Sequence, residues 1–228
     1  MSINLPLPLE IRQLVENFFV TLDPIRHSVP ALIRAGNLAG LQWYEDNGLP
    51  IYRPTQYSLL WYTPVEYAAW TGNLASLKWL QRRFPTTSKA FDTAAAMARL
   101  DILEWLHGQG YRGTSMAMDM AAQNGHLPCV IWLHRRGYNC TTSAMDFAAE
   151  NNHIEVVKWL DANRTEGCTT DAVDYALFFG HLEMVTWLLR HRSEGFTGEA
   201  LIRAHRLGQH DILRLMQSPV FWGNGLMS

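Results

Sequence analysis

The chain has 228 residues, of which 48% are hydrophobic and 18% charged, and its formal net charge is −2. A broad nucleic-acid-binding surface would be clearly basic, so this charge argues against nucleic acid as a partner. No apolar run approaches the ~20 residues of a membrane span, and no basic segment followed by an apolar one marks a signal peptide. The three cysteines fit a reducing compartment, which predicts a cytoplasmic protein that does not enter a membrane.

Residues 1–26 do not share the pattern of the rest of the chain and predict a capping helix. Apolar residues at helical spacing follow a Leu-Pro-rich opening, and Pro24 ends the helix because the residue before proline avoids the α region. Stacked folds need such a cap over the first repeat. Leu7–Ile11, read as Leu-Pro-x-x-Ile, also resembles the opening of an F-box, which would recruit a ubiquitin ligase. We favour the cap and keep the second interpretation open.

Tryptophan then recurs at a nearly fixed interval, which predicts stacked repeats. The column comprises Trp43, Trp79, Trp105, Trp132, Trp159 and Trp187, with Leu215 in the same place of a last copy. From Trp79 onward the interval is 26 to 28 residues. A period of this length is typical of repeat architectures. Each tryptophan lies on the apolar face of a helix, so we expect the column to be mostly buried against neighbouring repeats.

The first two tryptophans are 36 residues apart, and the extra residues form the aromatic segment, residues 50–62. Proline, tyrosine and tryptophan without a helical period predict a long loop or hairpin there. Long loops in compact folds are often functional. The alternative is that these aromatic side chains fold back over the N-terminal core, and the sequence does not decide between the two.

The stretch from Thr63 carries the signature of one repeat. A capping threonine, Pro64 and Glu66 open a helix, Gly72 ends it, and a second helix with Trp79 follows at once. This stretch resembles the ankyrin signature Thr-Pro-Leu-His-x-Ala-Ala-x-x-Gly-His, and later copies lie in phase at residues 143–149 and 171–176. The resemblance covers about residues 27–217 and leaves residues 218–228 as a tail. It implies an all-α, ankyrin-like solenoid of about seven stacked antiparallel helix pairs.

Two departures from the ankyrin pattern affect this expectation. The units are shorter than the usual ~33 residues, so the projecting hairpins should be tight turns without strands, as at residues 110–115 and 137–143. An acidic residue replaces the signature histidine in five units: Glu66, Asp92, Asp119, Asp146 and Asp174. Successive acids should be a repeat apart, too far to share a cation. We expect each carboxylate to accept amide hydrogens in the first turn of its own helix.

The sequence shows no catalytic, cofactor or metal site, so we expect no enzyme. His126, His153 and His181 recur at the turn between paired helices and do not form the clustered pairs of a zinc site. Cys140 and Cys168 occupy one position in adjacent repeats, roughly 10 Å apart, which is too far for a disulfide. Arginines at the ends of second helices complement the helix dipole, although a basic stripe that binds an acidic partner stays open.

The family resemblance implies a surface for another protein. In ankyrin folds the first helices line the concave face, and the two residues before each Gly-His or Gly-Asn turn point toward a partner; we call these positions the variable column. The candidate partner-binding residues are Arg34, Trp70, Thr71, Met97, Gln123, Asn124, Glu150, Asn151, Phe178, Phe179 and Arg206. Exposed aromatic side chains beside polar ones are typical of interface anchors. The alternative is that Phe178 and Phe179 fill a gap between first helices.

These expectations combine into a monomeric, non-catalytic scaffold that holds a partner protein without a cofactor. Two alternatives remain. The chain would be a substrate-recruiting adaptor of a ubiquitin ligase if residues 1–26 bind a ligase subunit. It would be a structural module if its repeats contact only other copies of itself.

Overall fold

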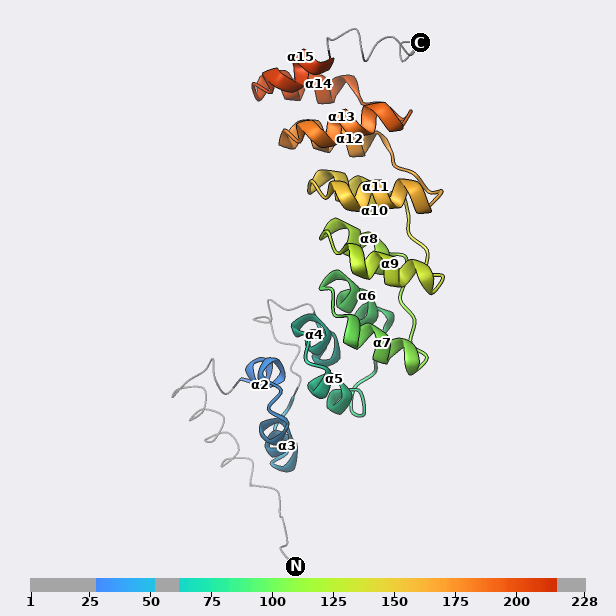
Figure 1. Ribbon diagram of the computed structural model, residues 1–228. Helices are drawn as coiled ribbons and strands as arrows, with labels where there is room; N and C mark the ends of the chain where they lie inside the picture. Colours follow the sequence, from blue (N-terminus) through green and yellow to red (C-terminus); the bar gives the residue numbers. More distant parts are fainter. Residues whose placement is uncertain (1–27, 52–61, 217–228) are drawn as a thin grey trace, which may run out of the picture. The chain divides into compact units, whose positions relative to one another are not determined.

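The computed structural model describes residues 28–51 and 62–216, and all regular secondary structure in these ranges is α-helical (Figure 1). The expectations for the cap at residues 1–26, for most of the aromatic segment and for the tail at residues 218–228 lie outside the described residues. Within the described residues, the short loops at residues 110–115 and 137–143 contain no strand, as predicted.

Consecutive helices pair, and seven pairs follow one another along the described chain. The first helices are α2 (Val29–Ala35), α4 (Pro64–Thr71), α6 (Ser88–Ala96), α8 (Met116–Gln123), α10 (Ser143–Glu150), α12 (Thr170–Phe179) and α14 (Gly198–Arg206). The second helices are α3 (Leu38–Asp46), α5 (Leu74–Leu80), α7 (Leu100–Gly108), α9 (Leu127–Arg135), α11 (Ile154–Asn163), α13 (Leu182–His191) and α15 (His210–Met216). The prediction of an all-α, ankyrin-like solenoid is confirmed.

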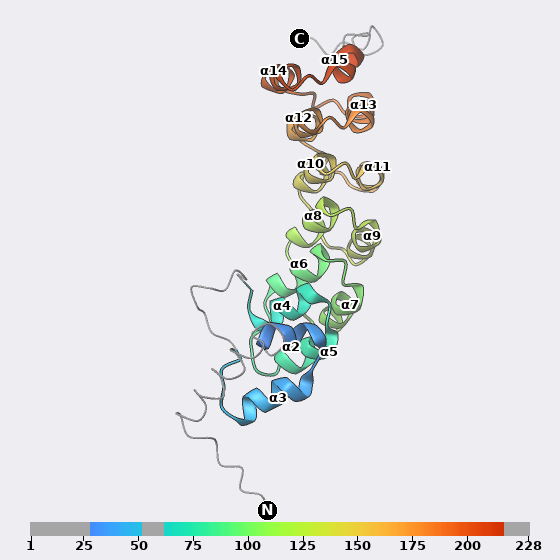
Figure 2. The same ribbon diagram turned by 90° about the vertical axis from the view of Figure 1, so that its left-hand side faces the viewer.

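The chain divides into two compact units. The first unit comprises the chain up to Ala94 together with Arg99–Arg112. The second unit comprises Ala95–Ala98 together with the residues from Gly113 onward. Within the second unit, α8, α10, α12 and α14 pack side by side in sequence order, and the second helices form the other layer (Figure 2). In the first unit, α2 packs on α4 and α3 on α5 in the same way.

Most first helices end in a residue with the left-handed backbone conformation that reverses the chain. Gly125, with φ of 73°, is such a position, and this conformation causes no steric strain there because glycine has no Cβ. Two repeats have other residues at this position, Ala98 with φ of 53° and Asn152 with φ of 60°. Asparagine tolerates this region better than alanine does. The turn at Ala98 therefore carries local backbone strain.

The core is built from small side chains on the first helices and leucines on the second. Pairs of alanines such as Ala148 and Ala149 are fully buried, which lets neighbouring first helices approach closely. The leucine after each tryptophan from Trp79 onward is also buried, at Leu80, Leu106, Leu133, Leu160 and Leu188. Burial of a leucine side chain contributes roughly 1.5–3 kcal/mol, so this leucine column holds much of the packing energy.

The tryptophan column is less buried than predicted. Trp132 is 8% exposed, in agreement with the prediction, whereas Trp43 is 36% exposed. Trp79, Trp105, Trp159 and Trp187 are half-buried. The leucine one position later points to the core instead, so each tryptophan ring lies at the edge of the core and covers it from outside.

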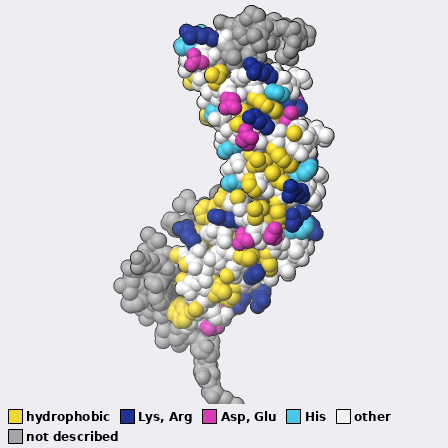
Figure 3. All heavy atoms as spheres, viewed as in Figure 1, with side chains coloured by type: hydrophobic (Ala, Val, Ile, Leu, Met, Phe, Trp, Pro, Cys, Tyr) yellow, Lys and Arg dark blue, Asp and Glu magenta, His cyan; other side chains and the backbone are white. Residues whose placement is uncertain are grey.

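In two repeats, an arginine four positions after the tryptophan closes this edge. The Arg83 guanidinium stacks over the Trp79 ring at 3.6 Å, and its Nη1 donates a hydrogen bond to the Trp79 carbonyl at 3.1 Å. Arg136 stacks over Trp132 at 3.9 Å. Figure 3 shows hydrophobic side chains gathered on the face that it draws, with basic side chains beside them. The prediction that arginines complement helix ends is therefore confirmed at Arg83, and both arginines also shield a ring.

Candidate functional site

Aspartates in the first helices of the second unit tie each repeat to the next. One carboxylate oxygen accepts the backbone N–H of a threonine in the following repeat, and the other accepts the hydroxyl of the same threonine. The pairs are Asp119 with Thr141, Asp146 with Thr169, and Asp174 with Thr197. The N···O distance is 2.8 Å in all three. We call these contacts the Asp–Thr joints.

The Asp–Thr joints correct the prediction that each acid caps its own helix. That prediction holds for Glu66, which accepts the backbone N–H of Thr63 at 2.9 Å, but Glu66 also accepts the hydroxyl of Thr87 at 3.0 Å. The side chain of aspartate is one methylene shorter than that of glutamate. In the three joints the bonds run to the next repeat instead, so the column of acids sets the spacing between repeats.

Asp146 is the most buried acid of the three, at 5% exposure. Burial raises the pKa of its carboxyl group, and the two hydrogen bonds from Thr169 oppose that shift without cancelling it. This joint therefore holds a carboxylate in a poorly solvated place, where loss of its partners would leave an unpaired charge.

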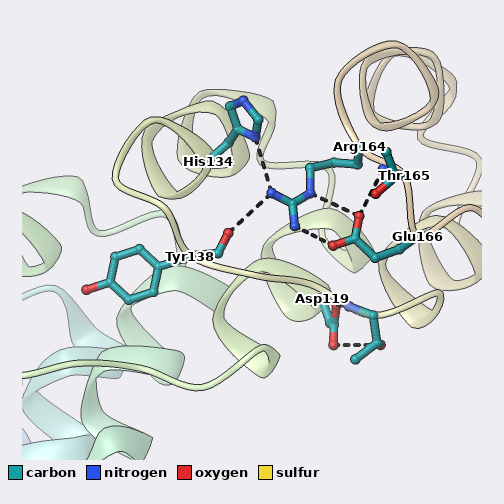
Figure 4. A network of polar contacts seen from close by, with 7 residues as sticks. Asp119, His134, Tyr138, Arg164, Thr165 and Glu166 are labelled. Carbon is teal, nitrogen blue, oxygen red and sulfur yellow. Dashed lines mark hydrogen bonds and ion pairs between the residues drawn. The ribbon is translucent and has the colours of Figure 1, made fainter.

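Two arginines form a second set of contacts between repeats. Arg164 pairs with Glu166 through both of its forked nitrogens, and its Nη1 lies 3.4 Å from Nδ1 of His134 and 3.5 Å from the Tyr138 carbonyl (Figure 4). The Arg164 hydrogen bond holds the pKa of the Glu166 carboxyl below its usual range. One repeat later, Arg192 pairs with Glu194 and with Asp161, the latter at 2.9 Å.

The sequence analysis missed this arrangement, although a signal for it exists. Residues 164–169 and 192–197 both read Arg-x-Glu-Gly-x-Thr, and the threonine of each is the partner in an Asp–Thr joint. The same segment thus provides an arginine fork and a joint threonine. The residue at the fifth place is Cys168 in the first copy; burial raises its pKa to about 12, so its thiol is an unreactive core group.

The turn histidines also hold neighbouring repeats together. Nε2 of His181 lies 2.9 Å from the Glu150 carbonyl at the end of the preceding first helix. His153 packs so closely on Gly125 that a Cβ there would lie 2.5 Å from its Nδ1. The histidines therefore act where the sequence placed them, between paired helices, and each satisfies or covers backbone of the previous repeat.

In the first unit, the structure brings the predicted residues Arg34 and Trp70 to one tyrosine. Arg34 is exposed, and its Nη2 donates a hydrogen bond to the Tyr67 hydroxyl at 2.9 Å. The half-buried Trp70 ring stacks on the Tyr67 ring with centroids 5.7 Å apart. Thr71 donates its hydroxyl to the Ala68 carbonyl at 3.1 Å. These three side chains thus have partners within their own unit.

In the second unit, the predicted residues fall into two groups. The exposed amides of Asn124 and Asn151 donate to the carbonyls of Ala96 and Phe147, at 3.0 and 2.9 Å. Gln123 and Met97 are half-buried, and Arg206 is exposed. The second group, Glu150 with Phe178 and Phe179, lies together in one groove.

The groove has a volume of about 290 Å³ and runs over α10, α12 and α14. Its aromatic side chains are Tyr175, Phe178 and Phe179, which are 40%, 40% and 50% exposed. Its acids are Glu150, Asp171, Asp174 and Glu199, and its lining also contains Thr197, Ala200 and Arg203. The structure therefore contradicts the alternative in which Phe178 and Phe179 fill a gap between first helices, because both rings border open space.

Sequence reasoning missed Tyr175, Asp171, Glu199 and Arg203 as members of this site. A signal existed for Tyr175, because it precedes Phe178 by three residues and so shares its helix face. The other three come from the first turns of α12 and α14 and from the second turn of α14. Spacing places Asp171 on one face with Tyr175, and Glu199 on one face with Arg203, but no spacing within one repeat predicts that the two faces meet.

The comparison with protein families now bears on this arrangement. A family model described as ankyrin repeats (many copies) matches residues 145–189, from within α10 to within α13. The match covers less than half of the chain, and this segment is similar to ankyrin repeats. Ankyrin repeats generally bind other proteins and are typically not enzymes. No curated protein matches the chain.

Over residues 28–51 and 62–216, no helix is long and apolar enough to cross a membrane. In the same part of the chain, no three His, Cys, Asp or Glu side chains gather where they could hold a metal ion.

Proposed function

We propose that this protein is a monomeric, non-catalytic binding module that holds a partner protein on the first-helix face of its second unit. The observation that carries the proposal is the pair Phe178 and Phe179, which are 40% and 50% exposed beside a groove of about 290 Å³. Large aromatic side chains that are left in water next to a groove are typical of interface anchors. Neither side chain is needed for the core, which the alanines and leucines fill.

The geometry of the pair favours binding because both rings are held in place. Phe178 and Phe179 pack edge to face with centroids 4.8 Å apart, and Phe179 stacks on the His181 ring at 6.0 Å. His181 is itself fixed by the Glu150 carbonyl. A partner that covers these rings therefore orders few new torsions, which reduces the entropy cost of binding.

The other residues of the variable column have lesser roles in this proposal. Asn124 and Asn151 already use their amides on helix carbonyls, and Thr71 uses its hydroxyl in the same way. Arg34, Trp70, Met97, Gln123 and Arg206 would add contacts at the rim of a larger interface. Rim contacts exclude water but contribute little energy individually.

The test is a capture experiment followed by a titration. The full chain, its F178A/F179A variant and Leu182→Ala would each be used to capture partners from native cell extract. Leu182 is 41% exposed and is absent from the groove lining, so it is the matched control. A partner held by the wild type and by Leu182→Ala would then be purified and titrated against all three proteins.

We expect Phe179→Ala alone to weaken binding of that partner by about 2 kcal/mol, with an unchanged melting temperature. A loss below about 1 kcal/mol in both Phe179→Ala and F178A/F179A, or a loss of several kcal/mol in stability, would reject the site. The ligase-adaptor alternative predicts co-purification with a ligase subunit that disappears when residues 1–26 are deleted. Light scattering at two concentrations tests self-association.

A further inference from the structure

Resting on the proposed function, we infer that the groove takes a short segment of the partner that carries a lysine or arginine beside an apolar side chain. The inference adds the chemistry of the partner to its place of binding. Three features of the groove support this chemistry: its charges, the ion pairs that these charges already make, and the aromatic rings beside them.

The charges of the groove are unbalanced. Four carboxylates line it, and Arg203 is its one cation. Arg203 is already bound, because its Nε lies 3.0 Å from Oε1 of Glu199 one helical turn away. The groove therefore has a net negative charge even with Arg203 counted.

Among the residues that the structure describes, two of the carboxylates have no neutralising partner. Asp174 is engaged in its Asp–Thr joint, and Glu199 pairs with Arg203. Glu150 and Asp171 make no side-chain ion pair with any residue that the structure describes. Glu150 ends α10 and Asp171 lies in the first turn of α12, so a cation that enters the groove meets one or the other of these charges.

The aromatic rings complement the same cation. A lysine or arginine head is attracted to the face of Phe or Tyr, and its aliphatic stem packs on apolar surface. Phe178, Phe179 and Tyr175 all line the groove next to the acids. A neighbouring apolar side chain of the partner would cover the ring area that the cation leaves exposed. Neither a purely acidic nor a purely apolar segment would satisfy both features.

The size of the groove favours a short segment. At about 290 Å³ it lies at the lower end of the usual volumes of ligand pockets, with room for only a few side chains. The tail of this chain, residues 218–228, contains no lysine, arginine or histidine and does not fit the inference. A nucleic acid would be repelled by the carboxylates.

The test selects short random peptides displayed on phage against the immobilised full chain. We expect enriched peptides to pair Lys or Arg with a neighbouring apolar residue. A synthetic peptide of that consensus would then be titrated against wild type, E150Q/D171N and the control Glu183→Gln. Glu183 is an exposed acid on α13 that is absent from the groove lining.

E150Q/D171N should weaken the consensus peptide about tenfold, while Glu183→Gln leaves its affinity unchanged. Replacing the basic residue of the peptide by glutamine should weaken it similarly, and both effects should shrink at high salt. Peptides without a basic residue that bind equally well, or an unaffected E150Q/D171N variant, would overturn the inference.

Failure of this inference is distinguishable from failure of the proposed function. If selected peptides lack cations but lose binding in F178A/F179A, the groove binds proteins and only the stated chemistry is wrong. If no selected peptide depends on Phe178 or Phe179, both fall. A dimer seen by light scattering and lost in F178A/F179A would make a second copy the occupant and overturn the inference as well.

Discussion

The joints between repeats use the same contacts again and again in the second unit, whereas the variable column changes from repeat to repeat. Each joint pairs an aspartate with a threonine of the next repeat at the same 2.8 Å distance. The variable column holds amides at Asn124 and Asn151 but two exposed rings at Phe178 and Phe179. Stacking depends on one geometry that every repeat must meet, so its contacts recur. In the proposed function a partner would contact each repeat differently, so binding positions would be free to vary.

The largest test of this contrast sets a core leucine against an exposed ring. Leu133→Ala should lower the free energy of unfolding by about 3–4 kcal/mol, because Leu133 is fully buried in a central repeat. Phe179→Ala should change it by less than about 0.5 kcal/mol, because the ring is half-exposed. Urea denaturation followed by circular dichroism measures both. Equal losses would mean that the variable column is structural.

The next test breaks one joint. Asp146→Ala should cost about 2 kcal/mol, because it leaves the backbone N–H and hydroxyl of Thr169 without their acceptor. Asp146→Asn keeps an oxygen for the N–H, and its amide can donate to the hydroxyl, so it should cost much less. The same denaturation experiment compares them. If the two variants lose equal stability, the joint depends on charge and not on hydrogen bonding.

The pH dependence of the same pair separates charge from geometry. The pKa of Asp146 is raised in the folded protein, so the folded state takes up a proton at higher pH than the unfolded chain. The wild type should therefore gain stability relative to Asp146→Asn as the pH falls from 7 toward the ordinary carboxyl pKa. Denaturation midpoints of both proteins over this range provide the measurement. The opposite slope would show that the Thr169 bonds outweigh burial.

This contrast also explains how far the sequence could be read. Period, glycine turns and the in-phase signature predicted the helix pairs because each is a local property of one repeat. The aspartate joints were misassigned, since a carboxylate in a first turn fits its own helix and the next repeat equally well on sequence alone. Phe178 and Phe179 were predicted as candidates because they belong to one column. Glu199 and Arg203 were missed because the groove exists only when α12 and α14 lie side by side.

A smaller effect is expected at the arginine fork. Arg164→Ala should cost about 1 kcal/mol at neutral pH, because it removes contacts to Glu166, His134 and the Tyr138 carbonyl at a partly exposed site. The pKa of Glu166 is lowered by Arg164, so this stabilisation is present above the ordinary carboxyl pKa and lost as the pH falls through the lowered value. Arg164→Lys keeps the charge but not the fork and should recover little. A cost that persists at acid pH would assign the effect to packing.

The smallest effect concerns the turn that follows the variable column. Ala98 adopts φ of 53°, a conformation that costs an alanine roughly 1–2 kcal/mol, whereas glycine adopts it freely. Glycine also adds entropy to the unfolded chain, so Ala98→Gly should gain only about 0.5 kcal/mol. Gly125→Ala is the matched control at the same place in the next repeat, and it should be destabilising because its Cβ would lie 2.5 Å from Nδ1 of His153. Thermal melts of both variants decide the matter. Ala98 does not line the groove, so Ala98→Gly should also leave partner affinity unchanged. A change in affinity would mean that the turns, as well as the variable column, shape the binding face.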